Sequence, residues 1–255
     1  MAGNIVRHAF VIVFGNLRNA IKASLVPTLL LAGAVVGFGS IMDIPIVEGN
    51  MDLEDLSQSG VTVLAGLGLL VFAMFVFAWV AVTWHRFILK EEYPDVVPSI
   101  SGSSIWPYVA RTLMITLQFM LLLIPLFILI MALANILFSN IVTAAIFGVA
   151  LNVLYAFVWF RVAISLPSVA VGEHMGSMDA WEITSEHSRD ILMMSVVIIV
   201  LNSVMSMGVA TLFGGLPLVA FILRIIVQWT TMMVGISVLT TLYGHIVEGR
   251  SLSGS

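Results

Sequence analysis

The stretch TWHRFILKEE at residues 83–92 places one histidine close to two basic and two acidic residues. A histidine beside carboxylates can act as a general base, so His85 is a candidate catalytic group. The same residues also fit the end of a membrane-spanning helix, where a tryptophan such as Trp84 sits at the interface and a basic side chain such as Arg86 extends toward lipid phosphates. No second histidine stands at metal-ligand spacing from His85. We therefore expect a span terminus here, with no catalytic residue.

The segment VGEHMGSMDAWEITSEHSRD at residues 171–190 is the most polar part of the chain. Its two histidines, His174 and His187, each follow a glutamate, which could suit a divalent metal, but their spacing matches no recognised site. Acidic and basic residues recur at helical spacing toward its end. We expect an acidic-faced interfacial helix that offers a docking surface, with no metal and no cofactor.

Four polar residues lie inside otherwise apolar stretches: Arg224, Gln228, Asn152 and Asn202. Arg224 falls roughly 12 Å into a span that starts near Leu216, at about 1.5 Å per residue. No acidic residue occurs within a span core to pair with it, and an unpaired charge at such depth is costly. Two interpretations remain open. In the first, the residues form hydrogen bonds between helices, and Arg224 extends outward toward Asp43 or Glu48. In the second, they form a polar pathway or a lipid-headgroup site in which Arg224 holds a phosphate of the outer leaflet.

The composition of the chain indicates that these residues lie on or between membrane-spanning helices. Hydrophobic residues make up 60% of the chain and charged residues only 9%, whereas soluble domains carry about 25% charged residues. Apolar stretches that approach or exceed the roughly 20 residues needed to cross a bilayer lie near residues 23–42, 61–84, 112–135, 141–160, 191–213 and 216–242. The sequence predicts an all-α polytopic membrane protein, formed by residues 1–255 as a single integral membrane domain with six transmembrane helices.

Basic residues predict the orientation of these spans. Nine of the ten Lys and Arg residues fall before the first span, after the last, or in the connections on the same side. They are Arg7, Arg18, Lys22, Arg86, Lys90, Arg111, Arg161, Arg189 and Arg250. The opposite connection after the first span carries Asp43, Glu48, Asp52, Glu54 and Asp55 and no basic residue. By the positive-inside rule, both termini are expected in the cytoplasm.

An internal repeat is visible in the aromatic and basic residues. Trp-x-Arg at residues 84–86 recurs at 159–161, and Trp106 and Trp181 are separated by the same interval. The sequence thus predicts a threefold repeat, each unit an interfacial amphipathic helix followed by a helical hairpin, at residues 4–86, 101–161 and 177–243. The predicted interface anchors are Trp84, Arg86, Trp106, Trp159, Arg161 and Trp181.

Three motifs resemble a known family: Trp84-His85-Arg86, the stretch from Arg161 to Leu166-Pro167, and AWEITSEHSRDIL at residues 180–192. Together they resemble the YciC-like family of bacterial inner-membrane proteins, which is similar to the membrane domain attached to some glycerophosphodiester phosphodiesterases. The chain has no room for the phosphodiesterase barrel of about 250 residues. The resemblance implies a fold, a place in the bacterial inner membrane and a role in lipid handling or membrane-complex support, with no established chemistry.

Several enzyme classes lack their motifs in this chain. There is no P-loop, no Gly-x-Ser-x-Gly turn and no His-Glu-x-x-His pair. We therefore expect a non-enzymatic integral membrane protein that organises lipid or supports and assembles a larger membrane complex. Membrane lipids are the expected partners, another integral membrane protein is a possible one, and nucleic acid is not expected. The alternative is a small transporter or channel that uses the four polar residues; lipid chemistry at residues 171–190 is a weaker third.

Overall fold

The computed structural model describes residues 2–42, 60–98, 102–134 and 140–252, and throughout these ranges the regular elements are helices, with no strand. The predicted all-α class is therefore confirmed. The acidic connection that carries Asp43, Glu48, Asp52, Glu54 and Asp55 lies outside the described residues.

Six of the described helices are long and apolar enough to cross a membrane, as the sequence predicts. They are α2 (Leu17–Met42), α4 (Gly60–Lys90), α5 (Gly102–Ala132), α7 (Ile141–Ala163), α10 (Ser188–Phe213) and α11 (Pro217–Ile246). Asn140 caps the start of α7 by accepting a hydrogen bond from the backbone N–H of Thr143, and Pro217 opens α11 at a position where a missing N–H costs nothing. The chain is an integral membrane protein.

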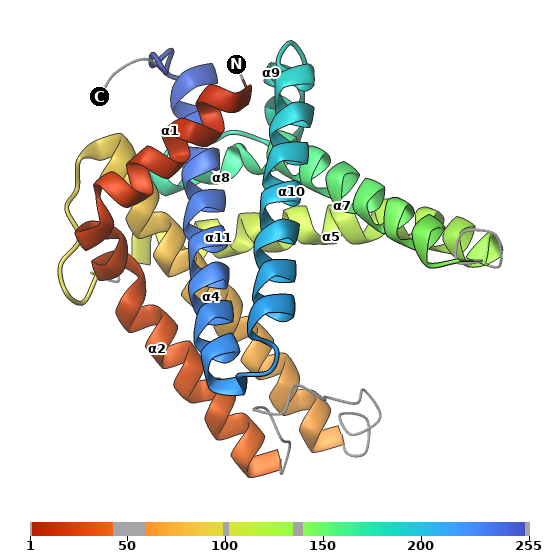
Figure 1. The fold of residues 1–255 in the computed structure, drawn as a ribbon. Coiled ribbons are helices and arrows are strands. Elements are labelled where there is room, and N and C mark those ends of the chain that lie inside the picture. The colour runs from red at the N-terminus through yellow and green to blue at the C-terminus, as the bar shows by residue number, and fades with distance from the viewer. Residues whose placement is uncertain (1, 43–59, 99–101, 135–139, 253–255) are drawn as a thin grey trace.

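Buried side chains gather at the end of the molecule where both ends of the described chain lie (Figure 1). Three shorter helices pack there: α1 (Ala2–Gly15), α8 (Ser165–Ala170) and α9 (Ser177–Ile183). We call this end the hub. It comprises α1, α8 and α9 with the segments that hold most of the buried residues, namely 76–89, 105–119, 156–171, 180–195 and 230–243.

Helix α1 is amphipathic, as predicted for an interfacial helix. Ile5, Ala9 and Val13 recur at helical spacing and are buried where α1 packs on α10 and α11. The opposite face exposes Arg7 and Phe14. The buried stripe fixes α1 to the hub, while the exposed face remains free to meet lipid headgroups.

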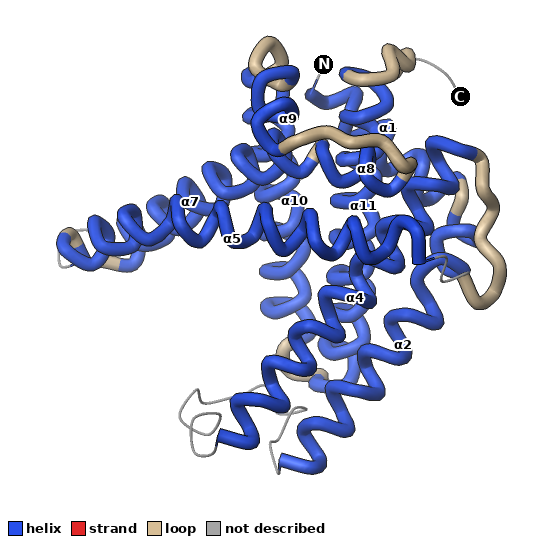
Figure 2. The backbone as a smooth tube through the Cα atoms, turned by 180° about the vertical axis from the view of Figure 1, so that it is seen from behind, coloured by secondary structure: helices blue, strands red, loops and turns tan. Residues whose placement is uncertain are grey.

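Three helical hairpins extend from the hub: α2–α4, α5–α7 and α10–α11. In both views the α5–α7 hairpin projects to the side of the other two (Figures 1 and 2). Few residues in the apolar windows of the spans are buried, so the outer parts of the hairpins expose their apolar flanks. The hairpins follow the chain order of the predicted repeat units; the repeat itself stays a prediction.

Candidate functional site

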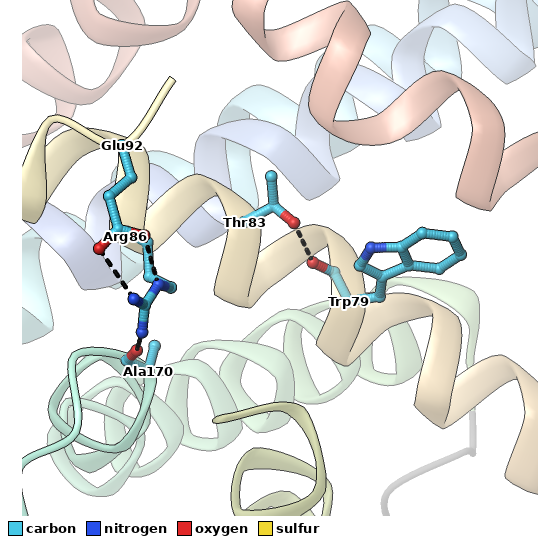
Figure 3. Close-up of polar contacts among 5 residues, drawn as sticks. All are labelled: Trp79, Thr83, Arg86, Glu92 and Ala170. Carbon is cyan, nitrogen blue, oxygen red and sulfur yellow. Dashed lines mark hydrogen bonds and ion pairs between the residues drawn. The ribbon is translucent and has the colours of Figure 1, made fainter. Parts of the chain in front are cut away.

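Arg86 joins the end of α4 to α8 (Figure 3). Its guanidinium donates from Nε and Nη2 to the two carboxylate oxygens of Glu92, at 2.7 and 2.8 Å, and from Nη1 to the backbone carbonyl of Ala170 at 3.2 Å. Glu91 adopts a left-handed conformation with φ of 56°, which turns the chain after α4 so that Glu92 meets Arg86. Arg86 is therefore engaged within the protein by a two-pronged ion pair.

His85 is fully buried one residue earlier, and both of its ring nitrogens have partners. Nδ1 lies 2.8 Å from Oγ1 of Thr240, and Nε2 lies 3.3 Å from the hydroxyl of Tyr108. Because the Thr240 hydroxyl donates to the carbonyl of Ile236 at 2.9 Å, it accepts from Nδ1–H, and the phenol then donates to Nε2. The imidazole is thus neutral and links α4, α5 and α11, with no nitrogen free to accept a proton from a substrate.

Two further polar pairs reinforce the hub. The indole N–H of Trp84 donates to the hydroxyl of Ser237 at 2.7 Å, and the hydroxyl of Tyr243 donates to a carboxylate oxygen of Glu173 at 2.6 Å. Trp84 has no exposed surface, because α11 packs over this face of α4 and supplies the hydrogen-bond partner of its indole. Its place at the membrane interface stays a prediction.

The segment after α11 closes the end of α4. Arg250 donates from Nη2 to the carbonyl of Leu89 at 2.8 Å and from Nη1 to the carbonyl of Ile88 at 3.3 Å. These carbonyls belong to the last turn of the helix, which has no N–H partners of its own. Gly244 allows this approach, because a Cβ at that position would lie 3.3 Å from Cδ of Arg250.

Arg161 fastens α9 to the end of α7. Its guanidinium carbon stands 3.6 Å from the centre of the Trp181 ring, and Nη2 donates to the Trp181 carbonyl at 2.6 Å. Nε donates to the hydroxyl of Thr184 at 3.1 Å. Arg161 is buried within the protein, and its role as an interface anchor stays a prediction. The sequence identified Arg161 and Trp181 separately, whereas the structure brings them together as a stacked pair.

The other predicted anchors have different surroundings. Trp106 is 62% exposed, as an interface anchor would be, and its ring packs near Phe75. Trp159 is half-buried and stacks with Tyr155, while Phe119 meets both rings edge-on. These three rings close the hub end of the space between α5 and α7.

The four polar residues predicted within the spans do not converge. Asn152 donates to the carbonyl of Gly148 in its own helix at 2.8 Å. Asn202 on α10 accepts from the hydroxyl of Thr231 on α11 at 3.2 Å. Arg224 and Gln228 are exposed on the outer half of α11. The structure therefore sets Asn152 on α7 apart from the other three, which belong to α10 and α11 and make one bond between helices.

Two apolar cavities lie beside the hub. A groove of about 520 Å³ separates α5 from α7. Its lining includes Phe119, Leu122, Leu126, Leu151, Asn152 and Tyr155. A central cavity of about 310 Å³ lies where the three hairpins meet, with walls from α4, α5, α7, α8 and α11. Its lining includes Phe77, Tyr108, Thr112, Trp159, Thr231 and Gly235. The sequence predicts that each of these helices is apolar, but it does not indicate which helix faces stay separated by a cavity.

The histidines of residues 171–190 lie apart from each other's expected metal partners. In the described ranges no group of three or more His, Asp or Glu side chains could hold a metal ion. His187 instead lies near His245, with ring centres 6.4 Å apart. Asp179 accepts a hydrogen bond from the N–H of Gly176 at 2.8 Å and stabilises the start of α9.

No known protein family, curated protein or solved structure matches the chain. A fold alone does not define a function. Its function must therefore follow from the hub, the hairpins and the two cavities.

Proposed function

We propose that the chain is a non-enzymatic protein of the bacterial inner membrane that binds and organises phospholipid, with the hub and both termini on the cytoplasmic side. The observation that carries this proposal is the apolar groove between α5 and α7. The basic residues of the hub, such as Arg7, Arg111 and Arg189, support the orientation because positive charge accumulates on the cytoplasmic side.

The size and lining of the groove suit an acyl chain. Its volume of about 520 Å³ falls in the range of about 300–1,000 Å³ that is usual for ligand pockets. Its walls are aliphatic and aromatic, and the amide of Asn152 already donates within its own helix. An empty apolar space would forfeit dispersion contacts along its walls. Because the groove lies between two spans, the apolar material at hand to fill it is the lipid tail.

The hub and the hairpins have different roles in this proposal. Buried hydrogen bonds at His85, Trp84 and Arg161 join the hairpins at one end, while their outer parts diverge and leave apolar faces open. Such a protein can hold lipid between hairpins that are fixed to one another at the hub. Transport through a polar path is less well supported, because Asn152 on α7 bonds only within its own helix and does not join the polar residues of α10 and α11.

Support of a larger membrane complex is a second candidate. It is favoured by the exposed surface of α9, where Met178 is 77% exposed and Glu182 and the nearby Glu186 also face outward. Exposed apolar side chains with charged neighbours, here Met178 and Ile183 beside Glu182, are a feature of docking surfaces. Recovery of one stoichiometric protein partner from native membranes, lost on Met178→Asp, would favour this role over lipid binding alone.

Filling the groove tests the lipid proposal. We expect the purified wild type to retain phospholipid in detergent, and the double variant Leu126→Trp/Leu151→Trp to retain less than half as much, because two indoles occupy the space of the tail. The matched control is Leu117→Trp/Val149→Trp, at exposed positions on the same helices outside the groove. Native mass spectrometry counts the lipids. Equal retention by both double variants would refute the proposal.

A further inference from the structure

A polar stripe runs along one face of α11. Arg224, Gln228, Thr231 and Gly235 stand at intervals of four, three and four residues, so they share a face of the helix. Arg224 and Gln228 are exposed, and Thr231 is half-buried against Asn202. Thr231 and Gly235 line the central cavity. The stripe therefore leads from the outer half of α11 to the cavity where the three hairpins meet.

Arg224 is the only charged residue on this stripe, and the part of the protein that the structure describes does not neutralise it. Within the described residues Arg224 has no hydrogen-bond or ion-pair partner. Helix α11 has no acidic residue, and the one acidic residue of α10, Asp190, lies in its first turn at the hub. Arg224 stands seven residues after Pro217, about 10 Å along the helix at about 1.5 Å per residue. An outward-facing guanidinium at this depth requires an anion.

The tip of the α10–α11 hairpin keeps Arg224 below the headgroup level. Leu212 and Leu218 are 77% and 72% exposed, and Leu216 is also exposed. No charged residue occurs between Asp190 and Arg224. Moving the hairpin outward until Arg224 reached the headgroups would push these leucines into water, which is unfavourable. A phosphate that sits deep in the leaflet would therefore satisfy the charge of Arg224 without exposing these leucines to water.

We propose that this stripe binds the phosphodiester of one phospholipid from the leaflet far from the hub, held deeper than its neighbours. Arg224 supplies the charge and paired N–H donors, a geometry that matches phosphate. Gln228, one turn closer to the hub, supplies a further amide donor. The inference rests on the proposed lipid-binding function but uses a site separate from the α5–α7 groove.

A lipid titration followed by native mass spectrometry tests the site. The probes are phosphatidylglycerol and a diacylglycerol with the same tails, which lacks the phosphate. The wild type should bind phosphatidylglycerol about tenfold more tightly, a difference of about 1.4 kcal/mol. Arg224→Gln should abolish this preference, and Arg224→Lys should retain part of it. Arg189→Gln, which removes an exposed cation at the hub end of α10, should bind as the wild type does.

Other outcomes would overturn the inference. It fails if Arg224→Gln keeps the preference, if the wild type binds both lipids equally, or if added inorganic phosphate competes, since that would indicate a site for soluble anions. The groove variant Leu126→Trp/Leu151→Trp should keep the preference for phosphate. If the groove variant retains both the phosphate preference and the wild-type amount of lipid, the groove proposal is refuted and the stripe proposal stands. If the groove variant loses lipid while Arg224→Gln keeps the phosphate preference, the stripe proposal is refuted and the groove proposal stands.

Discussion

Replacement of His85 by alanine is expected to lower the free energy of unfolding by about 2–4 kcal/mol, because it removes two buried hydrogen bonds and leaves a void between three helices. The hydroxyl of Tyr108 loses its acceptor, and that of Thr240 loses its donor. The contacts join α4 to α5 and α11, so the loss should loosen two hairpins from the third. Equilibrium unfolding in mixed detergent micelles measures the change.

His174 supplies the control for this experiment. It is exposed in the loop before α9, and His174→Ala should change the free energy of unfolding by less than about 0.5 kcal/mol. A double-mutant cycle between His85→Ala and Tyr108→Phe should show coupling, because both changes remove the same hydrogen bond. If His85→Ala behaves like His174→Ala, the buried imidazole does not hold the hub together.

The second large effect is expected at Arg161. Arg161→Ala removes the stacking on Trp181 and the hydrogen bonds to the Trp181 carbonyl and Thr184, which should cost about 2–4 kcal/mol. Helix α9 should then separate from α7, so amides in residues 177–184 should exchange hydrogen faster. Hydrogen exchange followed by mass spectrometry resolves this segment from the rest of the hub.

Lysine at position 161 should not restore the protein. A lysine keeps the charge but lacks the planar group that stacks on Trp181 while donating in two directions, so Arg161→Lys should resemble Arg161→Ala in exchange rate. Arg189→Ala, at an exposed position, is the matched control and should exchange as the wild type does. Protection restored by lysine would show that charge alone holds α9.

Much of the architecture follows from local sequence. The six spans could be predicted from the apolar runs, because each run is long enough to cross a bilayer. The hub coincides with the Trp, Arg and Lys residues at span ends, such as Trp84 and Arg161. These residue types suit a membrane interface. At this end of the molecule other helices pack over two of them: α11 covers Trp84 and α9 covers Arg161.

The partners of these residues could not be predicted. His85 lies far along the chain from Thr240, and neither residue carries a signal for the other. The groove could not be predicted from the sequence either, because nothing in an apolar helix distinguishes Leu126, which lines the groove, from Leu117, which lies outside it. Which face stays open depends on how the hairpins diverge, and that is decided by packing at the hub.

The account rests most on lipid occupying the α5–α7 groove, and photolabelling tests this directly. The probe is a phospholipid with a photoreactive group at the end of one tail, in bilayers that contain the protein, and cross-linked peptides are mapped by mass spectrometry. We predict that labels concentrate on groove residues such as Leu122, Leu126 and Leu151. Equally dense labelling of Leu117 and the other exposed outer faces would show that lipid solvates the groove no differently from the rest of the protein, and would contradict the account.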